Sequence, residues 1–370
     1  MIYRLFTADR SKLSGFSMGV KGVVTTNGRM NLMECIFRLE ELGQEFNDVV
    51  GKKCANLGEM AKIGLRVPPG FSLSLEAYRR FMSETGAQRE IVKYLESLPH
   101  NFENLDHFEE ASVELRKIVE SKEPPADLKE DILNCYREVC RKCNAERVAV
   151  STRSAGAASH PGQFETYLNV VGESDLIEKI VKVWSSTFNA RSIAARKRVG
   201  LPLESDPIGV AVIKMVNARA AGVLFTADPS TGDRSRMMIE ANWGLGESVV
   251  GGEAMPDMYL LNKESLGIVD RRLGTKKSCI VFKEVGVEEL ETTPDECNAF
   301  CLSDDEVMEI GRLGKILEAH FGKPQDAEWA IDRELTCPDS VILLQTRNAV
   351  IPEQKKPVDR ILDLMMSRLG

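Results

Sequence analysis

Residues 325–348, QDAEWAIDRELTCPDSVILLQTRN, contain two apolar-rich segments separated by a polar turn. Side chains alternate between the two faces of a β-strand, so Asp326 and Glu328 share one face of the first segment. The opposite face is apolar and consists of Ala327, Trp329 and Ile331. The same alternation places Gln345 and Arg347 on one face of the second segment. The stretch therefore predicts a β-hairpin with one polar and one buried face.

Pairing of these two strands would gather two carboxylates and an amide oxygen beside the guanidinium of Arg347. Such oxygen ligands suit Mg²⁺, which keeps several waters and shares its other ligands with phosphate oxygens. The alternation also predicts that Leu343 lies on the same face as Gln345. The solvated face of an edge strand is the alternative interpretation, and these residues alone leave both open.

Helical and strand patterns alternate along the rest of the chain, which predicts an α+β protein with a strand-rich second half. Two capping boxes are expected at helix starts, one formed by Asp127 with Glu130 and one by Ser303 with Glu306. Residues 176–199 show helical periodicity throughout and are predicted to form one long amphipathic helix.

The composition is that of a folded protein: the 370-residue chain is 43% hydrophobic and 28% charged, enough for two or more packed units. A formal charge of -8 lacks the basic surface that general nucleic-acid binding needs. The chain has no apolar run long enough to cross a membrane, and its start lacks the features of a secretion signal. We therefore expect a cytoplasmic protein with neither nucleic acid nor membrane as a partner.

Nine cysteines are scattered along the chain, and an odd count in a protein of this size argues against a disulfide framework. Cys135, Cys140 and Cys143 could belong to a metal or cluster site. They follow a helical pattern, however, and no fourth ligand is close in sequence. We favour the interpretation that they are thiols of a helix.

Two basic side chains stand where an anion could bind. Residues 47–60, NDVVGKKCANLGEM, place Lys52 and Lys53 at the start of a predicted helix. A helix N-terminus disfavours a lysine but favours an anion, so a lysine there is explained if it holds a phosphate. Arg153 stands where a strand gives way to a loop of small residues, and its guanidinium can reach a phosphate in a fork geometry. A surface arginine is the alternative.

Five blocks of sequence occur in a recognisable order. KCANLGEM with RVPPGFSLSLEAYRRF is the first, and STRSAG with PGQFETYLNV is the second. AGVLFTADPSTGD follows, then IEANWGLGESVVGG with PDMYLLNK, then DAEWAID with LLQTR. In these blocks the chain resembles the nucleotide-binding domain of pyruvate phosphate dikinase and phosphoenolpyruvate synthase, which also occurs in rifampin phosphotransferase and in the small subunit of phenylphosphate synthase.

The resemblance implies an ATP-grasp fold, in which two lobes close on ATP. Residues 37–207 are then expected to form the N-terminal lobe with a helical insert, residues 208–350 the C-terminal lobe and residues 351–370 a tail. Residues 1–36 precede the resemblance and are expected to be a disordered or mis-started extension, with Met33 as the true start.

ATP and Mg²⁺ are the cofactors that the resemblance implies. The residues that it implies for contacts to the phosphates are Lys53, Arg153, Gly162, Thr166 and Arg347. Within this set, Lys53 and the two arginines are the expected catalytic residues, and the other two belong to a loop over the phosphates. The implied Mg²⁺ ligands are Asp326, Glu328 and Gln345. The alternation along the two final strands predicts the same grouping of these three residues without the resemblance.

Departures from the family pattern concern both the site and the partner. The usual G-G-K-G is G-K-K-C here, so Lys52 and Cys54 replace glycines. Ile213 replaces the glutamine of a Gln-x-Met segment that contacts the nucleotide. None of the four histidines lies in the T-x-G-G-type segment that carries the phosphorylated histidine of the family's enzymes.

The resemblance thus implies the ATP-binding subunit of a split dikinase, active only with a partner. It would cleave ATP with Mg²⁺ and pass the β-phosphoryl group, directly or as pyrophosphoryl, to a histidine on the partner subunit, giving AMP and phosphate. Pyruvate or a phenol-like compound would be the final acceptor. A non-catalytic ATP-sensing module is the alternative, which the departures at Lys52, Cys54 and Ile213 favour.

Overall fold

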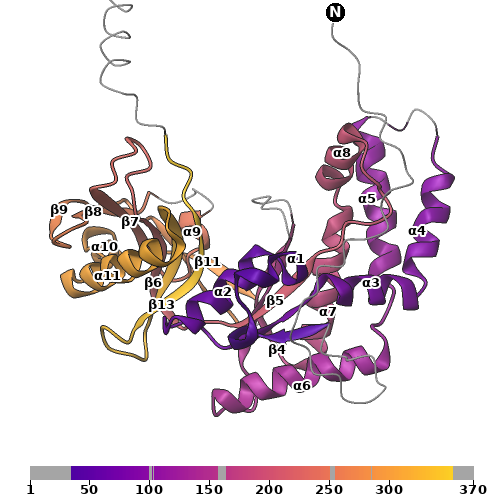
Figure 1. Cartoon of the computed structure of the whole chain (residues 1–370), viewed down its shortest axis with the longest axis horizontal. Helices are drawn as coiled ribbons and strands as arrows, with labels where there is room; N and C mark the ends of the chain where they lie inside the picture. The colour runs from indigo at the N-terminus through magenta and orange to yellow at the C-terminus, as the bar shows by residue number, and fades with distance from the viewer. Residues whose placement is uncertain are drawn as a thin grey trace, which may run out of the picture. The chain divides into compact units, whose positions relative to one another are not determined.

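The chain is represented by a computed structural model that describes residues 35–99, 102, 104–156, 164–250, 255–284 and 286–352. All of these belong to one compact unit, Met33–Gly370, whose helices and strands are shown in Figure 1. Of the predicted extension, only Cys35 and Ile36 are described. The predictions of a disordered segment and of a start at Met33 therefore lie outside the described residues.

Five antiparallel strands form the first sheet, in the order β1-β2-β5-β3-β4. The strands are β1 (Ile36–Arg38), β2 (Gly70–Leu73), β3 (Ala149–Ala155), β4 (Thr166–Val171) and β5 (Gly209–Lys214). β5 pairs with β2 and β3 although it follows residue 207. The lobe boundary expected at that residue remains a prediction.

Helices pack on the first sheet and enclose its hydrophobic core. They are α3 (Leu75–Glu84), α4 (Ala87–Glu96), α5 (Leu105–Glu120), α6 (Ala126–Lys142), α7 (Glu173–Ser185) and α8 (Ala190–Val199). Trp184 of α7 is fully buried in this core, with its ring centroid 4.8 Å from that of Phe81 on α3. Large buried aromatic side chains of this kind contribute much of the hydrophobic stabilisation of a core.

The single helix predicted over residues 176–199 is wrong, because η4 (Ser186–Phe188) separates α7 from α8. Ser185 and Thr187 donate through their hydroxyls to carbonyl oxygens of the preceding turn. Such bonds compete with continuation of the helix. Asn189 then caps α8 through its side-chain oxygen, and asparagine is among the preferred N-caps.

One of the two predicted capping boxes is confirmed, the one of Ser303 at the start of α11 (Asp304–Phe321). The box predicted for Asp127 is wrong, because α6 starts after Pro125 and has no side-chain cap. Proline has no N–H to donate in the reciprocal bond of a capping box. Asp127 instead pairs with Arg80 of α3.

Six antiparallel strands form the second sheet, in the order β13-β12-β6-β7-β8-β9, and β10 pairs with β11 separately. The strands are β6 (Ala218–Phe225), β7 (Arg236–Trp243), β8 (Asp257–Asn262), β9 (Ile268–Arg272), β10 (Ser278–Phe282), β11 (Val287–Glu291), β12 (Gln325–Asp332) and β13 (Val341–Asn348). α11 covers one face of the sheet, and two short helices, α9 (Glu247–Val250) and α10 (Pro294–Asn298), accompany it. Helices with antiparallel sheets confirm the predicted α+β class.

One helix from the first half of the sequence packs beside the second sheet (Figure 1). Three short turns, η2 (Leu39–Glu41), η3 (Gln44–Phe46) and α1 (Asn47–Val50), lead into this helix, α2 (Lys52–Lys62). Leu57 and Met60 of α2 share a buried cluster with Trp329 of β12 and Leu343 of β13. The helix of the predicted phosphate-binding lysine is therefore anchored next to the β12–β13 hairpin.

The nine cysteines all lie in the described residues and form no disulfide bond there. Cys135 and Cys140 lie on α6, and Cys143 is its C-cap. Within the described ranges, no group of three or more His, Cys, Asp and Glu side chains could hold a metal ion. Among the helices that are described, none is both long and apolar enough to cross a membrane.

Candidate functional site

β12 and β13 pair as the predicted hairpin and bring the polar residues together. Asp326 lies opposite Arg347, and Glu328 lies opposite Gln345. Directly opposed side chains point to the same face of a sheet. The other face of β12 is buried against α11 and consists of Ala327, Trp329 and Ile331. The alternation predicted for β12 is confirmed, and we call the side with the two carboxylates, Gln345 and Arg347 the polar face.

A β-bulge in β13 changes the predicted side of one leucine. Glu328 pairs with Gln345, but the next residue, Trp329, pairs with Leu343, so that Leu344 is the extra residue. An extra residue shifts the alternation of a strand by one position. Leu343 therefore joins the buried cluster with Trp329, and the prediction that it lies on the face of Gln345 is wrong.

Each carboxylate of the polar face has an arginine partner. Nε of Arg347 donates to Oδ2 of Asp326 at 2.7 Å, and Nη2 lies 2.6 Å from the same oxygen. Nη2 of Arg153, which comes from β3 of the first sheet, lies 3.2 Å from Oε2 of Glu328. The predicted phosphate-binding arginines therefore form ion pairs with two of the predicted metal ligands.

A third carboxylate, Glu240, lies in the same row of the sheet and was not predicted. It is opposite Val223 of β6, which in turn is opposite Glu328 of β12. Burial raises the pKa of Glu240, and the charge of Asp326 raises it further. Burial also raises the pKa of Asp326, although the hydrogen bond from Arg347 opposes this shift. A bound cation would oppose both shifts, because an opposite charge favours the ionised form of a carboxyl group.

Lys53 is at the beginning of α2, as predicted. Burial lowers its pKa, the positive charge of Arg153 lowers it further, and the negative charge of Glu328 opposes these effects. Among the residues that the structure describes, none forms an ion pair or hydrogen bond with the Lys53 ammonium. Lys53 therefore adds a third positive charge near the two arginines.

Gly51 allows α2 to start against the end of β3. Its φ of 82° lies in the left-handed region that glycine tolerates best. A Cβ at this position would lie 2.5 Å from the backbone of Ala155. The N–H of Lys52 donates to the carbonyl oxygen of Gly156 at 3.4 Å. Close approach of the two segments brings the lysine of α2 and Arg153 of β3 to the same place.

The other residues that the sequence singled out are distributed as follows. Thr166 begins β4, opposite the arginine of β3, whereas Gly162 lies outside the described residues. Cys54 and Ile213 are buried in the core that α2 shares with the second sheet. Lys52 is exposed to solvent. Two of the three departures from the family pattern therefore affect the core.

The donor set of the polar face is chemically suited to Mg²⁺. Asp326, Glu328 and Gln345 offer two carboxylates and an amide oxygen, the hard ligands that Mg²⁺ prefers. Asp326 and Gln345 are only 9% and 8% exposed, so water screens the charge of Asp326 weakly. Three cations beside such a set can neutralise a triphosphate.

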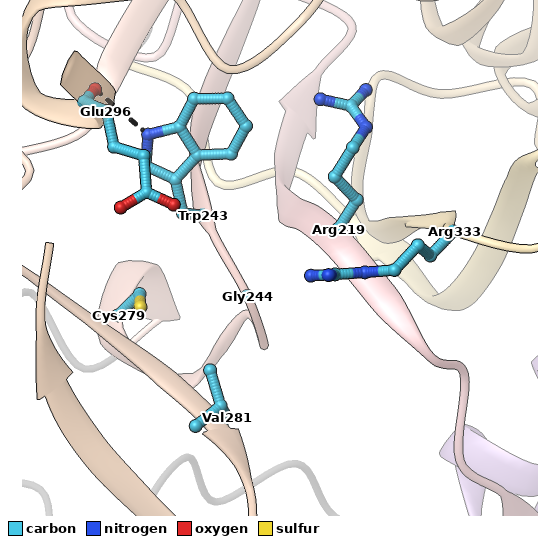
Figure 2. Close-up of a pocket in the computed structure, with 7 residues that line it drawn as sticks. All are labelled: Arg219, Trp243, Gly244, Cys279, Val281, Glu296 and Arg333. Atoms are coloured by element: carbon cyan, nitrogen blue, oxygen red, sulfur yellow. Dashed lines mark hydrogen bonds between the residues drawn. The ribbon is translucent and has the colours of Figure 1, made fainter. Parts of the chain in front are cut away.

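A cavity of about 220 Å³ lies apart from these residues. Figure 2 shows Arg219 and Arg333 on one side of the cavity and Trp243 and Cys279 on the other. Arg219 already pairs with Glu306 through Nη2 at 2.7 Å and donates to a backbone carbonyl oxygen. None of the predicted phosphate or metal ligands that the structure describes lines this cavity.

Comparison with known proteins gives one family and several close relatives. The family described as "Pyruvate phosphate dikinase, AMP/ATP-binding domain" matches residues 47–367. The chain is 36% identical over 353 residues to the phosphoenolpyruvate synthase of Aeropyrum pernix, with 87% of this chain and 43% of that protein aligned. It is 37% identical over 318 residues to a probable phosphoenolpyruvate synthase of Methanocaldococcus jannaschii, covering 84% of this chain and 27% of that protein. The chain spans less than half the length of these relatives.

Proposed function

The chain belongs to the pyruvate phosphate dikinase AMP/ATP-binding domain family, as the five sequence blocks predicted, and from this we propose that it cleaves ATP for a dikinase-type phosphotransferase. In this proposal the fold is an ATP-grasp fold, and the polar face of the second sheet receives the triphosphate with Mg²⁺. One observation carries the proposal, the convergence of three cations with two carboxylates and an amide. These residues are Lys53, Arg153, Arg347, Asp326, Glu328 and Gln345.

Binding would exchange the partners of the polar face. Arg153 and Arg347 would leave their carboxylates and donate to phosphate oxygens, which suit the fork of a guanidinium. Asp326 and Glu328 would then hold the metal ion together with Gln345. Bound Mg²⁺ supplies neutralisation of phosphate charge. Gly162 and Thr166 would lie over the phosphates, as the family resemblance implies.

The reaction would pass phosphorus from ATP to a histidine. A histidine nitrogen forms a bond to the β-phosphorus while the bond between that phosphorus and the bridging α-phosphate oxygen breaks, and AMP leaves with the electron pair. Water then releases the γ-phosphoryl group as phosphate. Such transfers require mainly alignment and charge neutralisation, which Lys53, Arg153 and Arg347 can provide without a protein nucleophile in this chain.

The histidine would be supplied by a separate subunit that also carries the acceptor-binding domain. The greater length of the phosphoenolpyruvate synthase relatives supports such a further part. Of the two histidines that the structure describes, His320 contacts Glu59 through Nε2 at 2.6 Å, and His107 lies on α5. Neither is part of the polar face. Pyruvate or a phenol-like compound would be the final acceptor.

Isotope labelling tests this proposal. The chain is incubated with Mg²⁺, the subunit that co-purifies with it and ATP labelled at either the β- or the γ-phosphorus. We expect the partner's histidine to retain the β label, with AMP and phosphate as products. Labelling from the γ position alone, with ADP as the product, would contradict the dikinase reaction. ATP binding without AMP formation would favour the alternative, a non-catalytic ATP-sensing module.

A further inference from the structure

The β13 edge of the second sheet is covered by α2 and by the segment that follows this helix. β13 is the edge strand, so some of its backbone groups point away from β12 and need other partners. The carbonyl oxygen of Thr346 accepts a hydrogen bond from Nδ2 of Asn56 at 2.8 Å. The N–H of Leu343 donates to the carbonyl oxygen of Arg66 at 2.9 Å. These bonds attach α2 directly to the strand that contributes to the polar face.

Asn56 connects two parts of the candidate site. It follows Lys53 by three positions, a spacing that places both residues on the same side of a helix. Its acceptor, Thr346, stands between Gln345 and Arg347 in β13. One hydrogen bond therefore joins the helix of the lysine to the backbone between a proposed metal ligand and a proposed phosphate ligand.

The position of the lysine ammonium depends on the position of this helix. Lys53 has no ion pair within the described part of the chain that could hold its flexible stem. α2 is fixed at its start by the close approach of Gly51 to β3 and one turn later by Asn56 to β13. The first attachment joins α2 to β3, the strand of Arg153, and the second joins it to β13, the strand of Arg347.

We propose that Asn56 is a positioning residue that holds Lys53 in place relative to Gln345 and Arg347. It acts through α2 and the backbone of β13 rather than through the phosphates. The consequence for catalysis rests on the proposed function. The placement of Lys53 does not depend on the proposed function and can be tested separately.

Acetylation of the ligand-free chain with acetic anhydride tests the placement. The readout is the ratio of modified Lys53 to modified Lys52, measured by mass spectrometry, with the exposed Lys52 as internal standard. Asn56→Ala is expected to raise the ratio about five-fold, which corresponds to a hydrogen bond of about 1 kcal/mol. An unchanged ratio would overturn the proposal. Asn56→Ser serves as a second variant if the alanine variant does not fold.

His320→Ala is the matched control for this measurement. It removes another contact of α2, the one between Glu59 and His320, which lies nearer the C-terminal end of the helix. A general loosening of α2 would raise the acetylation ratio in this variant as well. We expect the ratio to stay within about two-fold of the parent's, since the contact is distant from Lys53. Equal rises in both variants would refute a specific role of Asn56.

Calorimetric titration with Mg·ATP tests the consequence for the site. Asn56→Ala should weaken binding about five-fold in the parent chain but less than about two-fold in Lys53→Met, because a residue that acts through Lys53 loses its effect when Lys53 is gone. If the two substitutions instead weaken Mg·ATP binding by independent factors that multiply, the proposal is overturned. A parent chain that does not bind Mg·ATP would contradict the proposed function, while the acetylation ratio would still decide the placement of Lys53.

Discussion

Glu328→Gln separates the stability of the polar face from its proposed chemistry. Glu328 pairs with Arg153, and the side chains are 17% and 22% exposed. The same charge repels Asp326, whose pKa it raises. Removal of the charge of Glu328 therefore loses the attraction to Arg153 and relieves the repulsion of Asp326. We therefore expect the free energy of unfolding to change by no more than about 1 kcal/mol, or about 1–2 °C in melting temperature.

The expected effect on turnover is much larger. With glutamine at position 328, Asp326 and Gln345 remain as proposed metal ligands, but one of the two ligand carboxylates is lost. Removal of one preorganised electrostatic partner from a transition state costs about 3 kcal/mol, or on the order of a hundred-fold in rate. AMP formation, measured with labelled ATP and the partner subunit, should therefore fall by at least this factor while the melting curve is nearly unchanged.

Glu318→Gln is the matched control. Glu318 lies on α11, across the sheet from the polar face, and its side chain pairs with Lys263 at 3.0 Å. The two side chains are 25% and 17% exposed, similar to the Arg153–Glu328 pair. This variant should keep the AMP formation of the parent. Near-normal turnover in Glu328→Gln, or an equal loss in both variants, would refute the assignment of the polar face.

Three further predictions concern the helix of the lysine. Lys53→Met should lower AMP formation more than Mg·ATP affinity, since charge neutralisation matters most in the transition state. The exposed Lys52→Gly should retain both the rate and the affinity. Equal losses of rate and affinity in Lys53→Met would contradict this prediction. In urea unfolding, Gly51→Ala should lower the free energy of unfolding by about 1–3 kcal/mol more than Gly64→Ala. Both glycines have positive φ, but only at Gly51 would a Cβ meet backbone. Similar losses of stability in the two variants would argue against the close approach of Gly51 to β3. Burial raises the pKa of Cys54 to about 11, so the thiol ionises first in the unfolded chain. The free energy of unfolding should therefore fall as pH rises from about 8.5 to about 11. Between pH 8 and pH 10, Cys54→Ala should show a smaller decrease in the free energy of unfolding than the parent.

The polar hairpin could be predicted from sequence because alternation is a local property. Asp326 and Glu328 are two positions apart, and any strand conformation places them on one face. The bulge at Leu344 could not be predicted in this way. It depends on which residue of β13 packs beside Trp329 in the core, and packing is decided by side chains from α11 and α2 as well.

Contacts between distant segments were beyond the local patterns. Glu240 is the one acidic residue of β7, but its neighbour in the row, Glu328, is far away in sequence. The attachment of Asn56 to Thr346 likewise joins the two ends of the domain. By contrast, Asn189 and the hydroxyls before it were a local signal of the helix break between α7 and α8, which the strong helical periodicity concealed.

The two ion pairs of the polar face have a consequence for the proposed binding of Mg²⁺ and ATP. ATP alone must compete with Asp326 and Glu328 for the two arginines. Mg²⁺ alone must compete with Arg347 and Arg153 for the two carboxylates. When both ligands bind, each releases the side chains that the other needs, so the cost of breaking the pairs is met once rather than twice. Each ligand must then raise the affinity for the other by the same factor. The proposed site would therefore select the metal complex of the nucleotide, through partner exchange in addition to the affinity of Mg²⁺ for ATP itself.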